Sequence, residues 1–130
     1  MTLLRGLLWM SLLWPWLAPA APGSWSAEAP PVRVAVPGRV YHSEELLPPG
    51  DAASRGNYIQ KVRWRYSTPP GRSLRAWLCQ GERCLRLSGN RGISETLQGP
   101  AWSPLSFRFQ LPDGERRAVT VTDIQVLVNY

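Results

Sequence analysis

The chain has 130 residues, of which 15 are lysine or arginine and nine are aspartate or glutamate, giving a net charge of +6 at neutral pH. This length accommodates one small domain once the N-terminal segment is set aside. The sequence contains neither a glycine-rich phosphate-binding motif nor the spacing of a metal site, so it gives no support to a nucleotide-dependent or metal-dependent enzyme. We therefore expect no cofactor and no small-molecule substrate.

The N-terminal 20 residues have the order of a secretory signal peptide. Arg5 precedes an uncharged run at residues 6–17 (GLLWMSLLWPWL), and the small residues Ala18-Pro19-Ala20 follow it. The run is shorter than the roughly 20 residues that span a bilayer, and Pro15 interrupts it, so a retained transmembrane anchor is the weaker alternative. We expect cleavage after Ala20 and a single periplasmic domain, residues 21–130, that is not integral to the membrane. Export also argues against a nucleic-acid partner.

Two stretches of this domain lack the periodicity of packed elements. Residues 21–31 are rich in Ala, Pro, Ser and Gly, which predicts an extended N-terminal arm, although Trp25 could still dock on the domain. Residues 42–57 (HSEELLPPGDAASRGN) gather Pro, Gly, Ser and charge, which predicts a long, mobile surface loop. Between them, residues 32–36 (VRVAV) and 39–41 (RVY) are predicted to be short strands on either side of a Pro-Gly turn.

Residues 58–66 (YIQKVRWRY) form the clearest amphipathic strand. Their alternation predicts one buried aromatic face and one exposed basic face. The inward set is Tyr58, Val62, Trp64 and Tyr66, and the outward set is Lys61, Arg63 and Arg65. The basic face must therefore meet either solvent or an anionic partner.

Residues 74–87 (LRAWLCQGERCLRL) predict a β-hairpin at the centre of the domain. Two alternating runs flank the short loop 80–83, which contains a glycine. This pairing places Cys79 and Cys84 on one face of adjacent strands, where a disulfide can join them, and places the leucines on the core side. The spacing differs from that of thioredoxin-like motifs, but free thiols and redox or metal chemistry remain as lesser alternatives.

The C-terminal part continues the β pattern. Residues 93–97 predict a weak strand, 105–111 (LSFRFQL) a regular one, and 117–121 and 124–128 two more, with a tight turn or bulge at Thr122-Asp123. No stretch has sustained helical periodicity. The predicted fold is all-β, a small antiparallel β-sandwich or partly open barrel of about eight strands. Its core is expected to bury the following residues together: Val62, Trp64, Leu78, Leu85, Phe107, Phe109 and Val126.

Residues that could carry catalysis are sparse. His42 is the only histidine and lies in the predicted loop beside Ser43 and Glu44, where nothing would orient a catalytic dyad. Glu44 and Glu45 are adjacent, so their carboxylates diverge in an extended chain and are poorly placed to act as a pair. We predict a protein that is not an enzyme.

The predicted outward positions are mostly basic. If their strands are neighbours, these residues form one cationic surface that includes a tryptophan: Lys61, Arg63, Arg65, Arg75, Trp77, Arg86 and Arg108. Such a surface can simply keep the sheet soluble and prevent edge-to-edge aggregation. It can also bind an acidic protein surface or an anionic envelope polymer. Both interpretations stay open on the sequence alone.

Several short motifs, taken in order, resemble the flagellar protein FlhE family. They are Trp64-Arg65-Tyr66, Leu74-Arg75, Leu78-Cys79-x4-Cys84, Leu87-x-Gly89, Leu105-x-Phe107 and Val126-x-Val128-Asn129-Tyr130. The resemblance implies a periplasmic accessory of the flagellar type III export apparatus that supports assembly and limits proton leakage through the export channel. It also implies a chaperone-like or plug-like contact with a flagellar export or rod protein. The alternative, from charge alone, is a free-standing periplasmic binder of anionic glycan or lipid headgroups.

Overall fold

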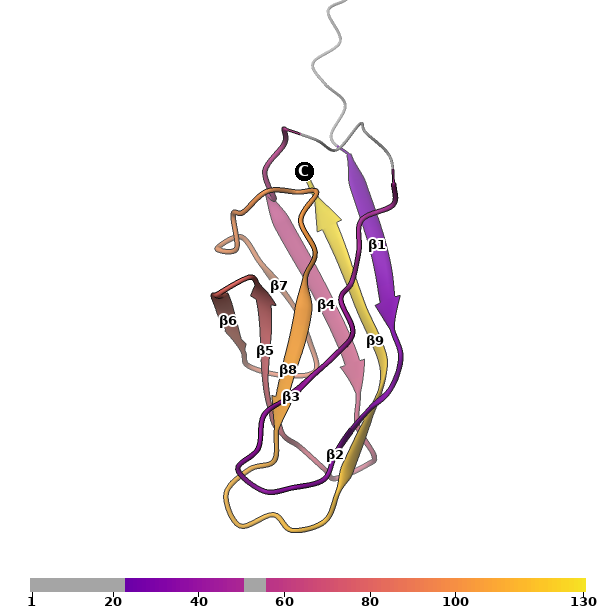
Figure 1. The fold of residues 1–130 in the computed structure, drawn as a ribbon, viewed down its shortest axis with the longest axis vertical. Coiled ribbons are helices and arrows are strands. Elements are labelled where there is room, and N and C mark those ends of the chain that lie inside the picture. The colour runs from indigo at the N-terminus through magenta and orange to yellow at the C-terminus, as the bar shows by residue number, and fades with distance from the viewer. Residues whose placement is uncertain (1–22, 51–55) are drawn as a thin grey trace, which may run out of the picture.

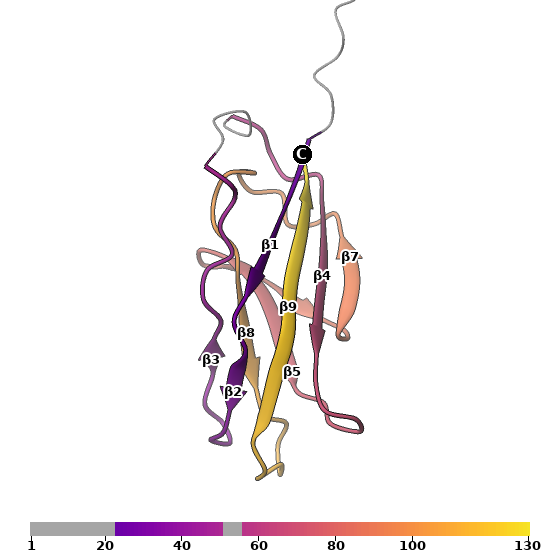
Figure 2. The same cartoon turned by 90° about the vertical axis from the view of Figure 1, so that its right-hand side faces the viewer.

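The computed structural model describes residues 23–50 and 56–130, which form nine strands and no helix. The strands lie in two antiparallel sheets whose inner faces share one core (Figures 1 and 2). The predicted all-β antiparallel sandwich is confirmed, with nine strands where about eight were expected. The predicted signal peptide, residues 1–20, lies outside the described residues.

The long C-terminal strand β9 (Val119–Asn129) organises the larger sheet. This five-stranded sheet has the order β1-β9-β4-β7, and β2 also pairs with β9. Its other strands are β1 (Ser24–Ala29), β2 (Val32–Val34), β4 (Lys61–Ser67) and β7 (Arg91–Ser94). As Figure 2 shows, β9 therefore has partners on both of its edges.

A β-bulge lies in β9 where two separate strands were predicted. Asp123 has a left-handed backbone, with a φ of 49°, and the register with β4 shifts at this point. On the other edge, Pro30 and Pro31, between β1 and β2, face the same stretch of β9. Because proline has no amide N–H, these two residues cannot continue the ladder. The bulge at Thr122-Asp123 is confirmed, whereas separate strands at 117–121 and 124–128 were wrong.

The N-terminal arm is a packed strand along residues 24–29. β1 pairs with β9 from Ser24 opposite Asn129 to Ala29 opposite Ile124. Trp25 is 4% exposed, and its Nε1–H donates to the carbonyl of Ala101 at 2.7 Å. The expectation of an unpacked arm was therefore wrong here. The small side chains concealed an alternation in which every second residue from Trp25 to Ala29 faces the core.

The segment predicted as one long loop, 42–57, is partly built into the smaller sheet. β3 (Tyr41–His42) pairs with β8 (Ser106–Gln110), and the fully buried Leu46 bridges to Leu105. The loop prediction was therefore wrong for His42 and Leu46, because the prolines and charges around them masked two short pairings. The part of the prediction that falls on residues 51–55 lies outside the described residues.

The smaller sheet has the order β3-β8-β5-β6 and contains the predicted hairpin. β5 (Arg75–Gln80) and β6 (Arg83–Leu87) pair antiparallel, and a disulfide joins the directly opposed Cys79 and Cys84. Leu78 and Leu87 are buried in the core, as predicted. The structural disulfide is confirmed.

Loss of this disulfide should lower the free energy of unfolding by only about 2 kcal/mol, because a bridge that closes so short a loop removes little entropy from the unfolded chain. Urea unfolding of the C79A/C84A variant, compared with the oxidised wild type, measures the change. Wild-type protein kept reduced with dithiothreitol is the matched control, since it loses the bond without losing side-chain volume. Unchanged midpoints in both samples would show that the bond does not stabilise the fold.

A cluster of aromatic rings joins the two sheets. Tyr66 of β4 packs edge-on against Phe107 and Phe109 of β8, with ring centroids 6.3 and 5.4 Å away. Of the seven residues predicted to form the core, six are buried, and Leu85 packs against them from a partly exposed position. The predicted core is therefore confirmed.

The inward face of β4 begins later than predicted. Tyr58 is 68% exposed, whereas its neighbour Ile59 is 2% exposed. The chain bends at Gln60, before β4 begins, and this bend interrupts the alternation. The prediction was therefore wrong for Tyr58, although it holds for the inward residues of β4 itself.

Candidate interaction surface

The predicted basic residues divide between two opposite outer faces of the sandwich. β4, which carries Lys61, Arg63 and Arg65, lies in the five-stranded sheet (Figure 1). The others lie in the four-stranded sheet, with Arg75 and Trp77 on β5, Arg86 on β6 and Arg108 on β8. A single cationic surface required these strands to be neighbours, and they are not. Because the two sheets bury their inner faces against each other, their basic faces point in opposite directions.

On the four-stranded face, the basic side chains are largely engaged within the protein. Trp77 is the cross-strand partner of Arg86 and Arg108, and the Arg86 guanidinium lies 5.0 Å from the Trp77 ring centroid. Arg75 Nη2 donates to the Asp113 carboxylate at 2.9 Å. Arg108 is half-buried, and its Nε has no hydrogen-bond partner within the part of the chain that is described. This face therefore holds two of its three arginines in internal contacts.

The five-stranded face carries three arginines without acidic partners. Arg63 and Arg65 lie on β4, and Arg91 lies on β7, directly opposite Arg65. No carboxylate of the described residues lies within 4.0 Å of these guanidinium groups, whereas the nearby Lys61 forms an ion pair with Glu95 at 3.8 Å. We refer to Arg63, Arg65 and Arg91 as the arginine cluster.

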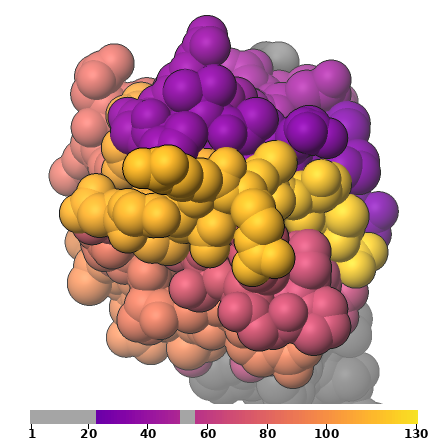
Figure 3. All heavy atoms as spheres, turned by 90° about the horizontal axis from the view of Figure 1, so that it is seen from below, coloured from indigo at the N-terminus to yellow at the C-terminus, as the bar shows by residue number. Residues whose placement is uncertain are grey.

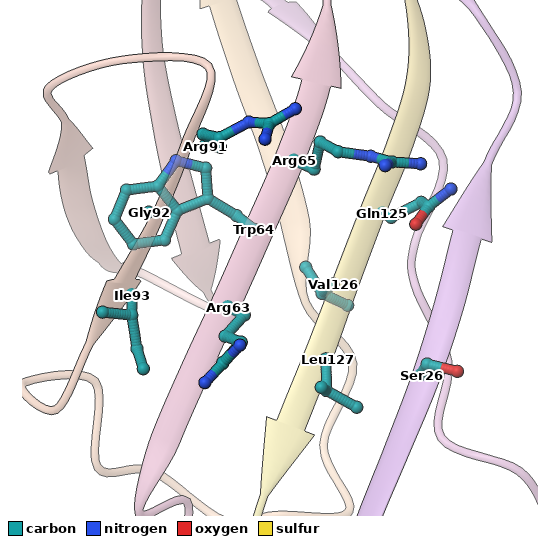
Figure 4. A pocket seen from close by; sticks show the side chains of 10 residues that line it. All are labelled: Ser26, Arg63, Trp64, Arg65, Arg91, Gly92, Ile93, Gln125, Val126 and Leu127. Atoms are coloured by element: carbon teal, nitrogen blue, oxygen red, sulfur yellow. The ribbon is translucent and has the colours of Figure 1, made fainter.

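A shallow, open depression surrounds the arginine cluster (Figure 4). Its volume is about 770 Å³, and its lining comes from β1, β9, β4 and β7. Ile93 and Leu127 flank Arg63 as its direct cross-strand partners. The depression thus combines three guanidinium groups with two aliphatic side chains.

Around His42, the described residues form no catalytic constellation. The Ser43 hydroxyl donates to the Glu44 carbonyl at 2.9 Å and accepts from the Phe107 amide at 2.9 Å, so it holds the chain against β8. His42 is exposed and lies opposite Arg108. Residues 23–50 and 56–130 also bring together no group of three or more His, Cys, Asp or Glu side chains that could hold a metal ion. The arginine cluster is therefore the stronger candidate for a binding site.

Comparison with known proteins identifies the family. The profile described as Flagellar protein FlhE matches residues 31–130. The chain belongs to the FlhE family. Flagellar protein FlhE of Escherichia coli is 33% identical over 127 residues, which cover 92% of this chain and 94% of that protein. Flagellar protein FlhE of Salmonella typhimurium is 41% identical over 76 residues, and this match spans 53% of the present chain and 57% of the relative.

The fold supports the same family. A solved structure described as Crystal Structure of FLHE superposes with a TM-score of 0.74 and is 31% identical in sequence. The superposition covers 84% of this chain and 96% of the other. In the described part of this FlhE-family chain, no helix has the length and apolar character that crossing a membrane requires.

Arg91, a member of the arginine cluster, was not among the residues predicted to bind a partner. The weak strand was placed at residues 93–97, but β7 is Arg91–Ser94. The chain turns after it, where the Ser94 and Thr96 hydroxyls are hydrogen-bonded at 2.9 Å. Arg91 directly follows the turn-forming residues 88–90 (SGN), and this turn signal could have located the start of the strand.

Figure 3 views the end of this domain where the loop after β4 lies beside the loop before β9. Arg72 has a structural role between these two loops. Its Nη2 donates to the Arg117 carbonyl at 2.7 Å and lies 3.5 Å from the Glu115 carboxylate, which joins the loop after β4 to the loop before β9. A hydrogen bond from the Arg117 amide, assisted by the nearby Arg72 and Arg117 guanidiniums, lowers the pKa of the Glu115 carboxyl. Glu115 is therefore ionised at neutral pH, and we assign this contact to loop packing and not to binding.

Proposed function

We propose that this FlhE-family chain is a periplasmic accessory of the flagellar type III export apparatus. In this role it supports flagellum assembly and limits proton leakage through the export channel by a chaperone-like or plug-like protein contact, without catalysing a reaction. The observation that carries the proposal is the family match over residues 31–130. The signal-peptide pattern of residues 1–20 supports a periplasmic location.

The proposed partner is an export or rod component of the flagellum, and its proposed contact surface is the arginine cluster. Three unpaired guanidinium groups around an open depression suit the recognition of an anionic surface. Of the residues predicted to bind a partner, Arg63 and Arg65 keep that role, and Arg91 joins them. The remaining candidates on the four-stranded face would need a second contact surface.

Deletion of the gene in its native host should leave flagellar genes expressed but lower the cytoplasmic pH of flagellated cells placed in acidic medium. A ratiometric, pH-sensitive fluorescent protein measures this change. A plasmid-borne wild-type copy should restore the pH, and fractionation of the same cells should place the protein in the periplasm.

The control strain for this measurement carries the same deletion but lacks the export channel. Its cytoplasmic pH should stay normal, because no channel is present through which protons can leak. A normal cytoplasmic pH in flagellated deletion cells would contradict the proposed role in proton leakage.

A second candidate function is a free-standing periplasmic binder of anionic glycan or lipid headgroups. The unpaired arginine cluster supports it, because guanidinium groups pair with phosphate as well as with carboxylate. Co-sedimentation with purified cell-wall or lipopolysaccharide fractions would favour this function. Cross-linking to a flagellar component in the periplasm would favour the first.

A further inference from the structure

The outer face of the five-stranded sheet presents its side chains in two rows that cross four strands. Each residue of a row is the direct cross-strand partner of the next. The first row is Ile93, Arg63, Leu127 and Ser26, and the second is Arg91, Arg65, Gln125 and Glu28. Because same-face residues of a strand are two positions apart, the rows are separated by roughly 6.4 to 6.8 Å. One row is therefore mainly aliphatic around a single arginine, and the other begins with two arginines.

The second row contains an unfavourable pair. Arg65 and Arg91 face each other across β4 and β7, and like charges in this position destabilise a sheet. Arg63, diagonal to Arg91, adds further positive charge. Acidic partners lie within 4.0 Å of other cations of the chain, including Lys61, Arg72 and Arg75, but the described residues supply none to the cluster. A bound anion would supply the missing negative charge.

The side chains beside the cluster indicate which kind of anion fits. Figure 4 shows Ile93 and Leu127 on either side of Arg63, and Ile93 is 48% exposed. Trp64 is the only aromatic residue that lines the depression, and it is 7% exposed, so the surface offers no open ring for stacking a sugar. Two separate aliphatic side chains also provide little area for the acyl chains of a lipid. An acidic protein segment with aliphatic side chains matches both rows.

We propose that the arginine cluster binds an extended protein segment whose acidic and aliphatic side chains alternate along one face. A segment lying along β4 spaces its same-face side chains by two residues, which matches the separation of the rows. Its carboxylate meets Arg65 and Arg91, and its next same-face side chain meets Ile93 and Leu127. The recognised pattern is Asp or Glu, any residue, then Val, Ile or Leu. This inference rests on the proposed function and specifies the chemistry of its partner.

A synthetic nonapeptide, Thr-Glu-Thr-Val-Thr-Glu-Thr-Val-Thr, is the probe. Titrated into isotope-labelled mature protein, it should shift the amide signals of β4, β7 and the adjoining part of β9, and leave the four-stranded sheet unchanged. Binding should weaken as salt is raised. Two control peptides replace every Glu with Gln or every Val with Ser, and each should bind at least about tenfold more weakly. Equal binding of the glutamine peptide would overturn the proposal.

On the protein side, the variant R63E/R65E/R91E should bind the probe at least about tenfold more weakly than the wild type. Its matched control, R33E/R83E/R116E, makes the same change in net charge at exposed arginines outside the depression and should bind normally. Equal binding by the two variants would refute the assignment. Binding of the wild type to vesicles of phosphatidylethanolamine and phosphatidylglycerol (3:1) in preference to the peptide, lost in R63E/R65E/R91E, would overturn it in favour of a lipid headgroup.

Thermal stability gives an independent readout. The single variant R91E converts the opposed pair with Arg65 into an attractive one, so its Tm should rise by about 2 to 4 °C while its binding of the probe weakens. A general loss of structure cannot produce this opposite movement of stability and binding. A lower Tm together with weaker binding would overturn the argument from charge repulsion.

The same variants separate this inference from the proposed function. In the deletion strain, the wild type and R33E/R83E/R116E should restore the cytoplasmic pH, whereas R63E/R65E/R91E should not. Restoration by the folded R63E/R65E/R91E variant would overturn this inference and the choice of the arginine cluster as the contact surface, but not the proposed role in limiting proton leakage. Absence of acidification in the deletion strain itself would instead count against the proposed function.

Discussion

Replacing Phe109 with alanine should lower the free energy of unfolding by about 3 to 5 kcal/mol. The ring is fully buried between two others, stacked on Phe107 at 5.7 Å and edge-on to Tyr66 at 5.4 Å. Burial raises the pKa of the Tyr66 phenol, so that ring is uncharged at neutral pH and packs as an apolar group. The neighbouring rings belong to paired strands and cannot collapse fully into the space that Phe109 would leave. Urea unfolding followed by tryptophan fluorescence measures the change.

Arg63→Ala is the control for this core substitution. Arg63 lies on the outer face of β4 and forms no ion pair with a described residue, so its truncation should change the free energy of unfolding by no more than about 0.5 kcal/mol. Equal losses in the two variants would mean that the strand faces had been assigned backwards.

Alternation of side chains predicted the core wherever a strand is regular and only one of its faces is buried. Along residues 105–111, every second residue is apolar, and all four of these residues are buried. The pair Cys79 and Cys84 was equally informative, because cysteines on either side of a hairpin loop can be brought directly opposite each other. In both cases the local geometry of a strand or a hairpin alone determines which side chains face the core or face each other.

Alternation could not show which sheet a strand joins. β4 and β5 follow each other in the chain, but they lie in different sheets. Since both sheets contribute an inner face to the same core, either arrangement gives the same hydrophobic pattern. The candidate surface was therefore predicted with outward side chains but with the wrong neighbours. Arg91 completes the part of this surface that lies on the five-stranded sheet, and its strand, β7, has only four residues.

Two short pairings were predicted only in part, for a related reason: a strand was expected at residues 39–41, but β3 is Tyr41–His42, and no pairing was expected at Leu46. β3 has two residues, and the contact between Leu46 and Leu105 is a single bridge, so neither is long enough to show a period. Their position is set by β8, which would otherwise expose the backbone groups of its outer edge. Tertiary structure, and not local propensity, places these residues.

Replacing Gly92 with alanine should lower the free energy of unfolding by about 2 to 4 kcal/mol. A Cβ at this position would overlap the ring of Trp64, which is the cross-strand partner of Gly92 on β4. The ring can move away only by losing its burial or by breaking the hydrogen bond from its Nε1–H to the Gly89 carbonyl at 3.1 Å. The backbone φ of Gly92 is not positive, so the cost comes from side-chain overlap and not from backbone strain.

Gly89→Ala is the matched control for Gly92→Ala. A Cβ at Gly89 meets nothing within 4 Å, so its free energy of unfolding should change by no more than about 0.5 kcal/mol. The double variant G92A/W64L should lose less than the sum of its single variants, because leucine leaves room for the new Cβ. Additive losses would place the cost of the Gly92 substitution somewhere other than the Trp64 ring. Because Arg91 and Ile93 flank Gly92 on β7, G92A should also weaken binding of the acidic probe peptide, and G89A should not.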